Sequence, residues 1–161
     1  MGVSMPSASV TTPTSVPSAP TDASVLAGKW TYRSFNNDPT LVDGDPNKAL
    51  ALFFAEAIFT FAIPSSTALQ GAIDWPGGGL DLAGDITPSC DGLGPIVTIT
   101  GTGRPGTDTE GWEYDYFGQL AHTWPNGVNQ RPTVVGSVIR AKPHTGAPAG
   151  YVASFVAVKQ G

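Results

Sequence analysis

Residues 68–87 read ALQGAIDWPGGGLDLAGDIT, and this stretch decides the fold class. On each side of the central Pro-Gly-Gly-Gly run, apolar residues or glycine alternate with polar or small residues, so each half has two distinct faces. Such alternation is typical of a β-strand with one buried face, and a Pro-Gly-rich run between two such segments is typical of a turn. These residues therefore predict an antiparallel hairpin.

The same pattern recurs along most of the chain. Segments of this kind, separated by runs rich in Gly, Pro, Asn and Asp, predict strands near 28–36, 49–63, 68–75, 79–87, 95–103, 111–121, 133–142 and 150–159. Segment 49–63 allows one long strand with a bulge or a short helix followed by a strand, because Asp45-Pro46 is a typical helix start while Leu50, Leu52 and Phe54 alternate. Eight or nine short strands with short connections predict an all-β, up-and-down antiparallel barrel.

Composition limits the number of domains and the classes of partner. The chain has 161 residues with 20 Gly and 15 Pro, which fits a single barrel domain over 25–161 after a Ser/Thr/Pro-rich N-terminal arm over 1–24. The net charge is −5, and the eight Lys and Arg are scattered. Because the sequence has no cluster of basic residues that could neutralise a phosphate backbone, we expect no nucleic-acid partner.

Two predicted strands, 133–142 and 150–159, are apolar on both faces. A strand of this kind is typically buried on both sides. Only 13% of all residues are charged, so part of the barrel exterior is expected to be apolar as well. We therefore expect a homo-oligomer that associates through these strands, or an N-terminal arm that covers them.

The remaining composition signals exclude several kinds of site. No basic segment followed by an apolar one begins the chain, and no apolar run approaches the ~18 residues of a membrane span, so we expect a soluble protein without a membrane partner. The single cysteine, Cys90, excludes an intrachain disulfide. His122 and His144 lack a spacing suited to metal binding, and we expect neither a metal nor a cofactor.

The first predicted strand carries a motif of known barrels. Gly28-x-Trp30, preceded by an apolar turn, resembles the first-strand signature of the lipocalins, and avidins open with a similar motif. This resemblance implies a calycin-like barrel in which Gly28 packs closely at the closed end and Trp30 plugs it. In the resemblance a late-strand arginine stacks on the first-strand tryptophan, and Arg140 is the arginine available for that role.

Other parts of the resemblance are incomplete. Asp115-Tyr116 is similar to the second lipocalin motif, but Tyr114 stands where that motif has a threonine. The late tryptophans of the avidin biotin pocket are missing, since the last tryptophan is Trp124. The resemblance therefore implies a barrel and no particular ligand.

The strand predicted over 111–121 is the richest in chemistry. Trp112, Tyr114 and Tyr116 share one face, and Glu113 and Asp115 share the other. Inward-facing aromatic residues would line a ligand pocket or simply fill a core. Inward-facing carboxylates would have raised pKa values and would suit acid–base chemistry. The sequence alone therefore does not decide which face of this strand points into the lumen.

The candidate ligand site is placed at the open mouth and upper lumen. His122 and Trp124 follow the aromatic strand directly, and Trp30 and Tyr32 lie on the first strand. The candidate ligand-binding residues are Trp112, Tyr114, Tyr116, His122, Trp124, Trp30 and Tyr32. Arg33 is expected on a solvated outer face, or else paired with Glu113 or Asp115 inside the lumen.

Three functions fit this sequence. The leading hypothesis is a barrel that binds an apolar or aromatic small molecule in its lumen, since an eight-stranded barrel can hold one small ligand. The second is a cofactor-free isomerase or cyclase of the allene-oxide-cyclase or Diels–Alderase barrel type, which needs little beyond cavity shape and one or two polar groups. The third is a structural or interaction barrel whose lumen is filled by its own side chains.

Overall fold

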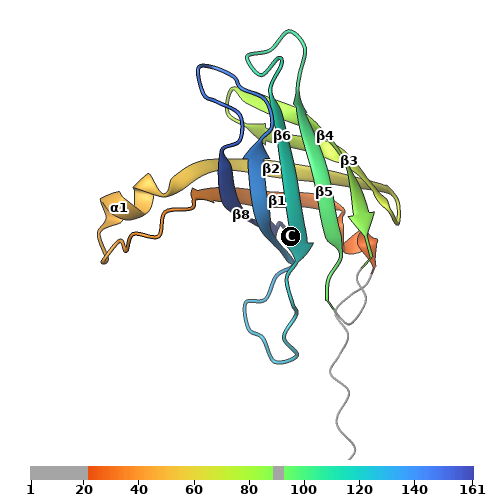
Figure 1. Cartoon of the computed structure of the whole chain (residues 1–161). Helices are drawn as coiled ribbons and strands as arrows, with labels where there is room; N and C mark the ends of the chain where they lie inside the picture. Colours follow the sequence, from red (N-terminus) through yellow and green to blue (C-terminus); the bar gives the residue numbers. More distant parts are fainter. Residues whose placement is uncertain (1–21, 89–92) are drawn as a thin grey trace, which may run out of the picture.

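Eight antiparallel strands form a closed barrel in which each strand pairs with the next and the last pairs with the first (Figure 1). The computed structural model describes residues 22–88 and 93–161. The predicted all-β, eight-stranded, up-and-down barrel is confirmed. Most of the predicted arm over 1–24, and Cys90, lie outside the described residues.

The element bounds follow the predicted segments closely. The strands are β1 (Gly28–Asn36), β2 (Phe53–Ser65), β3 (Ala68–Trp75), β4 (Gly78–Thr87), β5 (Ile96–Gly103), β6 (Glu113–Leu120), β7 (Thr133–Arg140) and β8 (Val152–Lys159). A 3-10 helix, η1 (Ala23–Leu26), precedes β1, and a short helix, α1 (Pro46–Ala51), lies between β1 and β2. No helix in the described ranges is long and apolar enough to cross a membrane.

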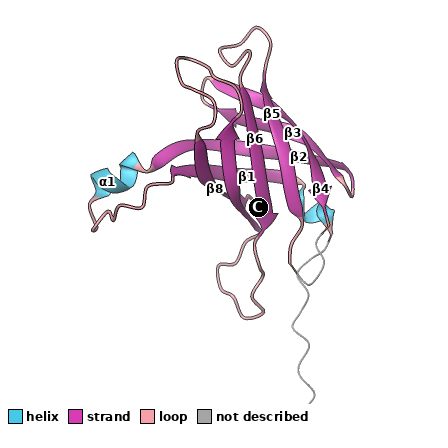
Figure 2. Ribbon diagram, in the orientation of Figure 1, coloured by secondary structure: helices cyan, strands magenta, loops and turns pink. Residues whose placement is uncertain are grey.

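Segment 45–65 resolves into a helix followed by a strand. The Asp45 carboxylate accepts a hydrogen bond from the Asn47 backbone N–H (2.8 Å), and Pro46 occupies the first helical position, which is favourable at a helix start. The helix ends at Ala51, and β2 begins at Phe53. As a result the β1–β2 connection, including α1, projects beyond the barrel (Figure 2).

One end of the barrel is closed by Trp30. This side chain is fully buried, and its Nε1–H donates a hydrogen bond to the Leu26 carbonyl of η1 (2.9 Å). The Lys159 ammonium lies 5.8 Å from the Trp30 ring centroid and donates to the Val25 carbonyl (2.7 Å). Trp30 thus joins η1, β1 and the end of β8 in one contact group.

The cation at Trp30 is Lys159 and not Arg140, which corrects the expectation from the sequence. The barrel register explains the difference, because Trp30 pairs with Lys159 at the end of β8. Arg140 pairs with Tyr114 at the start of β6, and β6 runs from the open end of the barrel toward the closed end. Arg140 therefore lies at the opposite end from Trp30.

A layer of aromatic side chains crosses the middle of the lumen. The Tyr32 and Phe59 ring centroids lie 4.9 Å apart, and those of Phe59 and Tyr116 lie 5.4 Å apart, both in edge-to-face geometry. Phe155 completes the layer at 5.5 Å from Tyr32. Below this layer the lumen is a packed apolar core that reaches Trp30. The layer therefore separates a filled half of the barrel from the half that carries the site.

The outer wall over β6, β7 and β8 is apolar and exposed in the single chain. Phe117 is 55% exposed, Val135 45% and Val152 43%. The inward residues of the same strands, such as Val134 and Ala153, are buried. The two apolar faces predicted for 133–142 and 150–159 are thus one core face and one exposed face, and self-association through the exposed face stays a prediction.

We expect light scattering of the purified protein at micromolar concentration to give the mass of an oligomer. The double change Val135→Lys and Ile139→Lys places two charges on the exposed wall and should return a monomer, because like charges facing each other disfavour a symmetric interface. Ala83→Lys, on the outer face of β4, is the control and should leave the mass unchanged. A wild-type monomer would contradict the prediction.

Candidate functional site

A cavity of about 450 Å³ occupies the half of the barrel above the aromatic layer and opens at its mouth. Six of the eight strands contribute to its wall, together with the β3–β4, β5–β6 and β7–β8 loops. The lining residues are Tyr32, Phe54, Ala55, Glu56, Ala57, Ile73, Trp75, Pro76, Leu80, Trp112, Tyr114, Tyr116, Val138 and His144. The wall is predominantly apolar and aromatic, with a few polar groups, as is usual for a small-molecule site.

The floor of the cavity is formed by Tyr32 and Tyr116, which belong to the aromatic layer. Burial raises the pKa of Tyr32 to about 12 and raises the pKa of Tyr116 well above its ordinary value. Both phenols are therefore neutral at physiological pH. They give the floor an apolar surface with hydroxyl groups that can orient a ligand.

Three stacked rings form one side of the mouth. The rings of Trp75, at the end of β3, and Trp112 lie nearly parallel, with centroids 6.3 Å apart and an interplanar angle of 21°. His144 stacks on Trp112 at 3.7 Å and 14°. The loop between β7 and β8 brings His144 there by a tight turn, in which His144 and Ala147 exchange two backbone hydrogen bonds. Gly146 has a φ of 79°, which favours glycine in such a turn.

The position of Trp112 depends on a buried threonine in the loop between β5 and β6. The Thr109 carbonyl accepts a hydrogen bond from the Trp112 backbone N–H (3.0 Å). The Thr109 hydroxyl donates to the Gly79 carbonyl (2.8 Å) and is buried. Because the loop is thus tied to the start of β4, Trp112 is held against the mouth.

A polar cluster of Tyr114, His144 and Arg140 lies beside the stacked rings. The Tyr114 hydroxyl oxygen is 2.8 Å from His144 Nε2 and accepts a hydrogen bond from Arg140 Nε (3.2 Å). His144 Nδ1 lies 2.9 Å from the Thr145 hydroxyl. Burial, and then the Arg140 charge, lower the pKa of His144, so this imidazole is neutral at physiological pH.

The carboxylates of β6 point away from the lumen. The Glu113 carboxylate pairs with the Lys142 ammonium (2.6 Å), and the Asp115 carboxylate accepts from the Thr100 hydroxyl (2.7 Å). Tyr114 and Tyr116, on the other face, line the cavity. The orientation that the sequence left open therefore has aromatic residues inside, and an inward acid–base pair of carboxylates does not form.

Arg33 lies on the outer face. Its Nε is 2.7 Å from a Glu56 carboxylate oxygen, and about half of each side chain is exposed. The alternative in which Arg33 pairs with Glu113 or Asp115 inside the lumen is not what the structure shows. Glu56 still contributes to the rim of the cavity.

Four of the seven predicted ligand-binding residues line the cavity, namely Trp112, Tyr114, Tyr116 and Tyr32. His122 and Trp124 do not, because they follow the other end of β6, where their rings contact each other at 5.0 Å. Trp30 belongs to the closed end. A strand advances about 3.3 Å per residue, so residues before and after an eight-residue strand lie at opposite ends of the barrel.

Three groups at the mouth were not among the predicted site residues. These are His144, Arg140 and Trp75, which stack on or hydrogen-bond to the predicted aromatic residues. The up-and-down topology is enough to predict that residues near three of the connections lie close together. The β3–β4, β5–β6 and β7–β8 connections all lie at one end of such a barrel, which places Trp75, Trp112 and His144 together.

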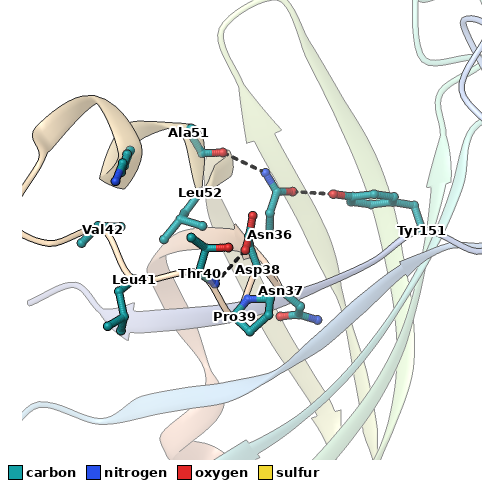
Figure 3. Close-up of a pocket in the computed structure, with 11 residues that line it drawn as sticks. Asn36, Asn37, Asp38, Pro39, Thr40, Leu41, Val42, Ala51, Leu52 and Tyr151 are labelled. Carbon is teal, nitrogen blue, oxygen red and sulfur yellow. Dashed lines mark hydrogen bonds between the residues drawn. The ribbon is translucent and has the colours of Figure 1, made fainter.

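A second cavity, of about 650 Å³, is lined by the end of β1, the projecting β1–β2 connection and Tyr151 (Figure 3). Its polar side chains already have partners within the protein. Asn36 accepts a hydrogen bond from the Tyr151 hydroxyl (2.8 Å) and donates to the Ala51 carbonyl (3.1 Å), while Asp38 accepts from the Thr40 backbone N–H (2.8 Å). These contacts hold the connection in place, so we assign this cavity a structural role.

Within the ranges 22–88 and 93–161, no group of three or more His, Cys, Asp or Glu side chains is placed to hold a metal ion. The groups at the mouth cavity are its aromatic rings, its phenols and the Tyr114–His144–Arg140 cluster. Comparison with protein-family models, with curated proteins and with solved structures finds no match to this chain.

Proposed function

We propose that this protein binds an apolar or aromatic small molecule in the mouth cavity of its barrel. The observation that carries the proposal is the cavity itself, whose 450 Å³ falls within the range of about 300–1,000 Å³ that is usual for small-molecule sites. Its wall combines aromatic faces with few polar groups, a composition that favours a largely apolar ligand.

The contrast between the two halves of the lumen supports binding over a purely structural role. Below the aromatic layer, buried side chains such as Trp30, Phe59 and Phe61 fill the barrel. Above it, the lumen is open although several large rings surround it. Protein interiors are normally closely packed, so an apolar space of this size is more readily explained by a ligand than by packing.

The three stacked rings at the mouth allow the simplest test of ligand binding. We expect N-phenyl-1-naphthylamine, a neutral apolar dye, to bind with a saturable rise in fluorescence. Trp112→Ala should weaken this binding about tenfold or more, because burial of an aromatic side chain against the ligand is worth about 1.5–3 kcal/mol. A fluorescence titration at constant protein concentration measures the change.

Trp124→Ala is the matched control, since it removes the same side chain from the loop beyond the opposite end of β6. This tryptophan is 67% exposed, and its loss should leave dye affinity within about twofold. Equal effects of the two changes, or an effect of Trp124→Ala alone, would show that the dye is not in the mouth cavity.

The cofactor-free isomerase or cyclase stays a second hypothesis. The contact that favours it is the 2.8 Å approach between the Tyr114 hydroxyl and His144 Nε2, which places a proton donor beside a neutral base at the cavity wall. A hydroxyl that donates to a substrate carbonyl and an imidazole that moves a proton between two carbons would need no cofactor.

A further inference from the structure

Arg140 is a buried cation at the mouth. It is the last residue of β7 and lies on the same inward face as Val134 and Val138, and it is only 9% exposed. Its Nε donates to the Tyr114 hydroxyl (3.2 Å), and one terminal nitrogen donates to the Pro148 carbonyl (2.9 Å). The guanidinium carbon lies 5.9 Å from the Tyr114 ring centroid and 5.6 Å from that of Tyr151.

Arg140 has no counter-charge in the part of the chain that the structure describes. Several carboxylates at this end of the barrel are already paired with other cations, namely Glu56 with Arg33, Glu113 with Lys142, and Asp74 and Asp81 with Arg104. No carboxylate of the described residues lies within 4.0 Å of an Arg140 nitrogen, and both of its hydrogen-bond acceptors are neutral. A buried charge is normally paired with an opposite charge. Arg140 lacks such a partner, so an anion that binds beside it would be stabilised.

Tyr114 connects this charge to the cavity. Arginine can only donate, so the Tyr114 oxygen accepts from Arg140, and its own proton is free to be directed. In the neutral His144 either ring nitrogen can carry the proton. When Nε2 carries it, the imidazole also donates to the Tyr114 oxygen, and the phenol hydrogen can turn toward the cavity. Two donors on the phenol oxygen strengthen the hydrogen bond that the phenol gives.

We propose that the ligand of the mouth cavity carries one anionic oxygen group, such as a carboxylate or sulfonate, on an apolar or aromatic body. The Tyr114 hydroxyl donates to that group, and Arg140 and His144 stabilise it from behind. This inference rests on the proposed binding function and narrows it to aromatic or apolar acids.

The inference includes a dependence on pH. An anion at Tyr114 favours the charged imidazolium of His144, so binding raises the pKa of His144 above the lowered value of the free protein. A pKa that is raised on binding makes the affinity increase as pH falls toward the free-protein value. Among the described residues, the charge that acts on His144 is that of Arg140 on β7. The Arg33–Glu56 and Glu113–Lys142 pairs are each internally compensated, so a bound ligand would supply the only added negative charge. A neutral ligand should show no such increase.

Two dyes with the same ring system test the proposal. 1-Anilinonaphthalene-8-sulfonate carries a sulfonate, and N-phenyl-1-naphthylamine lacks it. We expect Arg140→Met, which keeps an apolar side chain of similar length, to weaken binding of the sulfonate dye about tenfold or more and to change binding of the neutral dye less than about twofold. Arg131→Met, which removes an exposed arginine from the β6–β7 loop at the opposite end of the barrel, is the control and should affect neither dye strongly.

Tyr114→Phe gives a second and milder variant in case Arg140→Met fails to fold. It keeps the ring and removes only the hydroxyl, and it should weaken the sulfonate dye selectively. The affinity of wild type for the sulfonate dye should also rise between about pH 8 and pH 5, and His144→Gln should remove this rise. If both dyes bind and every variant affects them equally, the anion proposal is overturned while the binding function stands. If neither dye binds the wild type, the binding function itself fails.

Discussion

Trp30→Ala is expected to lower the free energy of unfolding by about 3–5 kcal/mol, the usual cost of removing a buried aromatic side chain. Trp30 is fully buried, contacts Phe61 at 6.4 Å between ring centroids and donates to the Leu26 carbonyl. Its loss would open a cavity at the closed end and leave that carbonyl without its donor. For a chain of this length each kcal/mol corresponds to roughly 2–4 °C, so thermal unfolding should shift by on the order of 10 °C.

Trp30→Phe separates the two contributions, since it keeps most of the ring burial and removes the hydrogen bond to Leu26. A cost of about 1 kcal/mol is expected for that change. Trp124→Ala, at an exposed site, should stay within about 0.5 kcal/mol of wild type. Denaturant unfolding of the three variants measures all of these values. If Trp30→Ala proves as stable as Trp124→Ala, Trp30 does not close the barrel.

The strands could be predicted from the sequence because the alternation of apolar and polar residues is sufficient to identify each of them. In β3, Leu69 and Ile73 are buried where the alternation placed them, and in β4 the same holds for Leu80 and Leu82. The segment after Asp45 was ambiguous because it contains both signals in succession. A helix start is followed within a few residues by an alternating strand, and the two elements meet at Leu52.

The site could be predicted only in part, because its geometry depends on which end of the barrel each residue reaches. Trp112 and Trp124 are close in sequence, yet the length of β6 separates them. His144 is 30 residues from Tyr114 in sequence, but their side chains lie 2.8 Å apart. Local patterning shows which face of a strand a residue occupies. Contacts between loops at the mouth require the topology and the detailed path of the β7–β8 connection.

Ala57→Phe is expected to abolish binding of the neutral dye, or to weaken it about 100-fold or more. Ala57 lies on β2, is buried, and lines the mouth cavity beside its register partner Tyr32 on the adjacent strand β1. An apolar cavity of about 150 Å³ can hold a benzene, so an added phenyl ring would occupy roughly a third of the 450 Å³. The remaining space would no longer admit a ligand with two ring systems.

This change also distinguishes a ligand-binding barrel from a purely structural one, because only the ligand-binding barrel needs the empty cavity. Filling an unneeded void improves packing, so Ala57→Phe should leave the melting temperature unchanged or raise it while binding is lost. Ala62→Phe, on the exposed face of the same strand, is the matched control and should retain binding. If a folded Ala57→Phe protein binds the dye as wild type does, the dye occupies another surface, and the exposed wall around Phe117 becomes the first place to look.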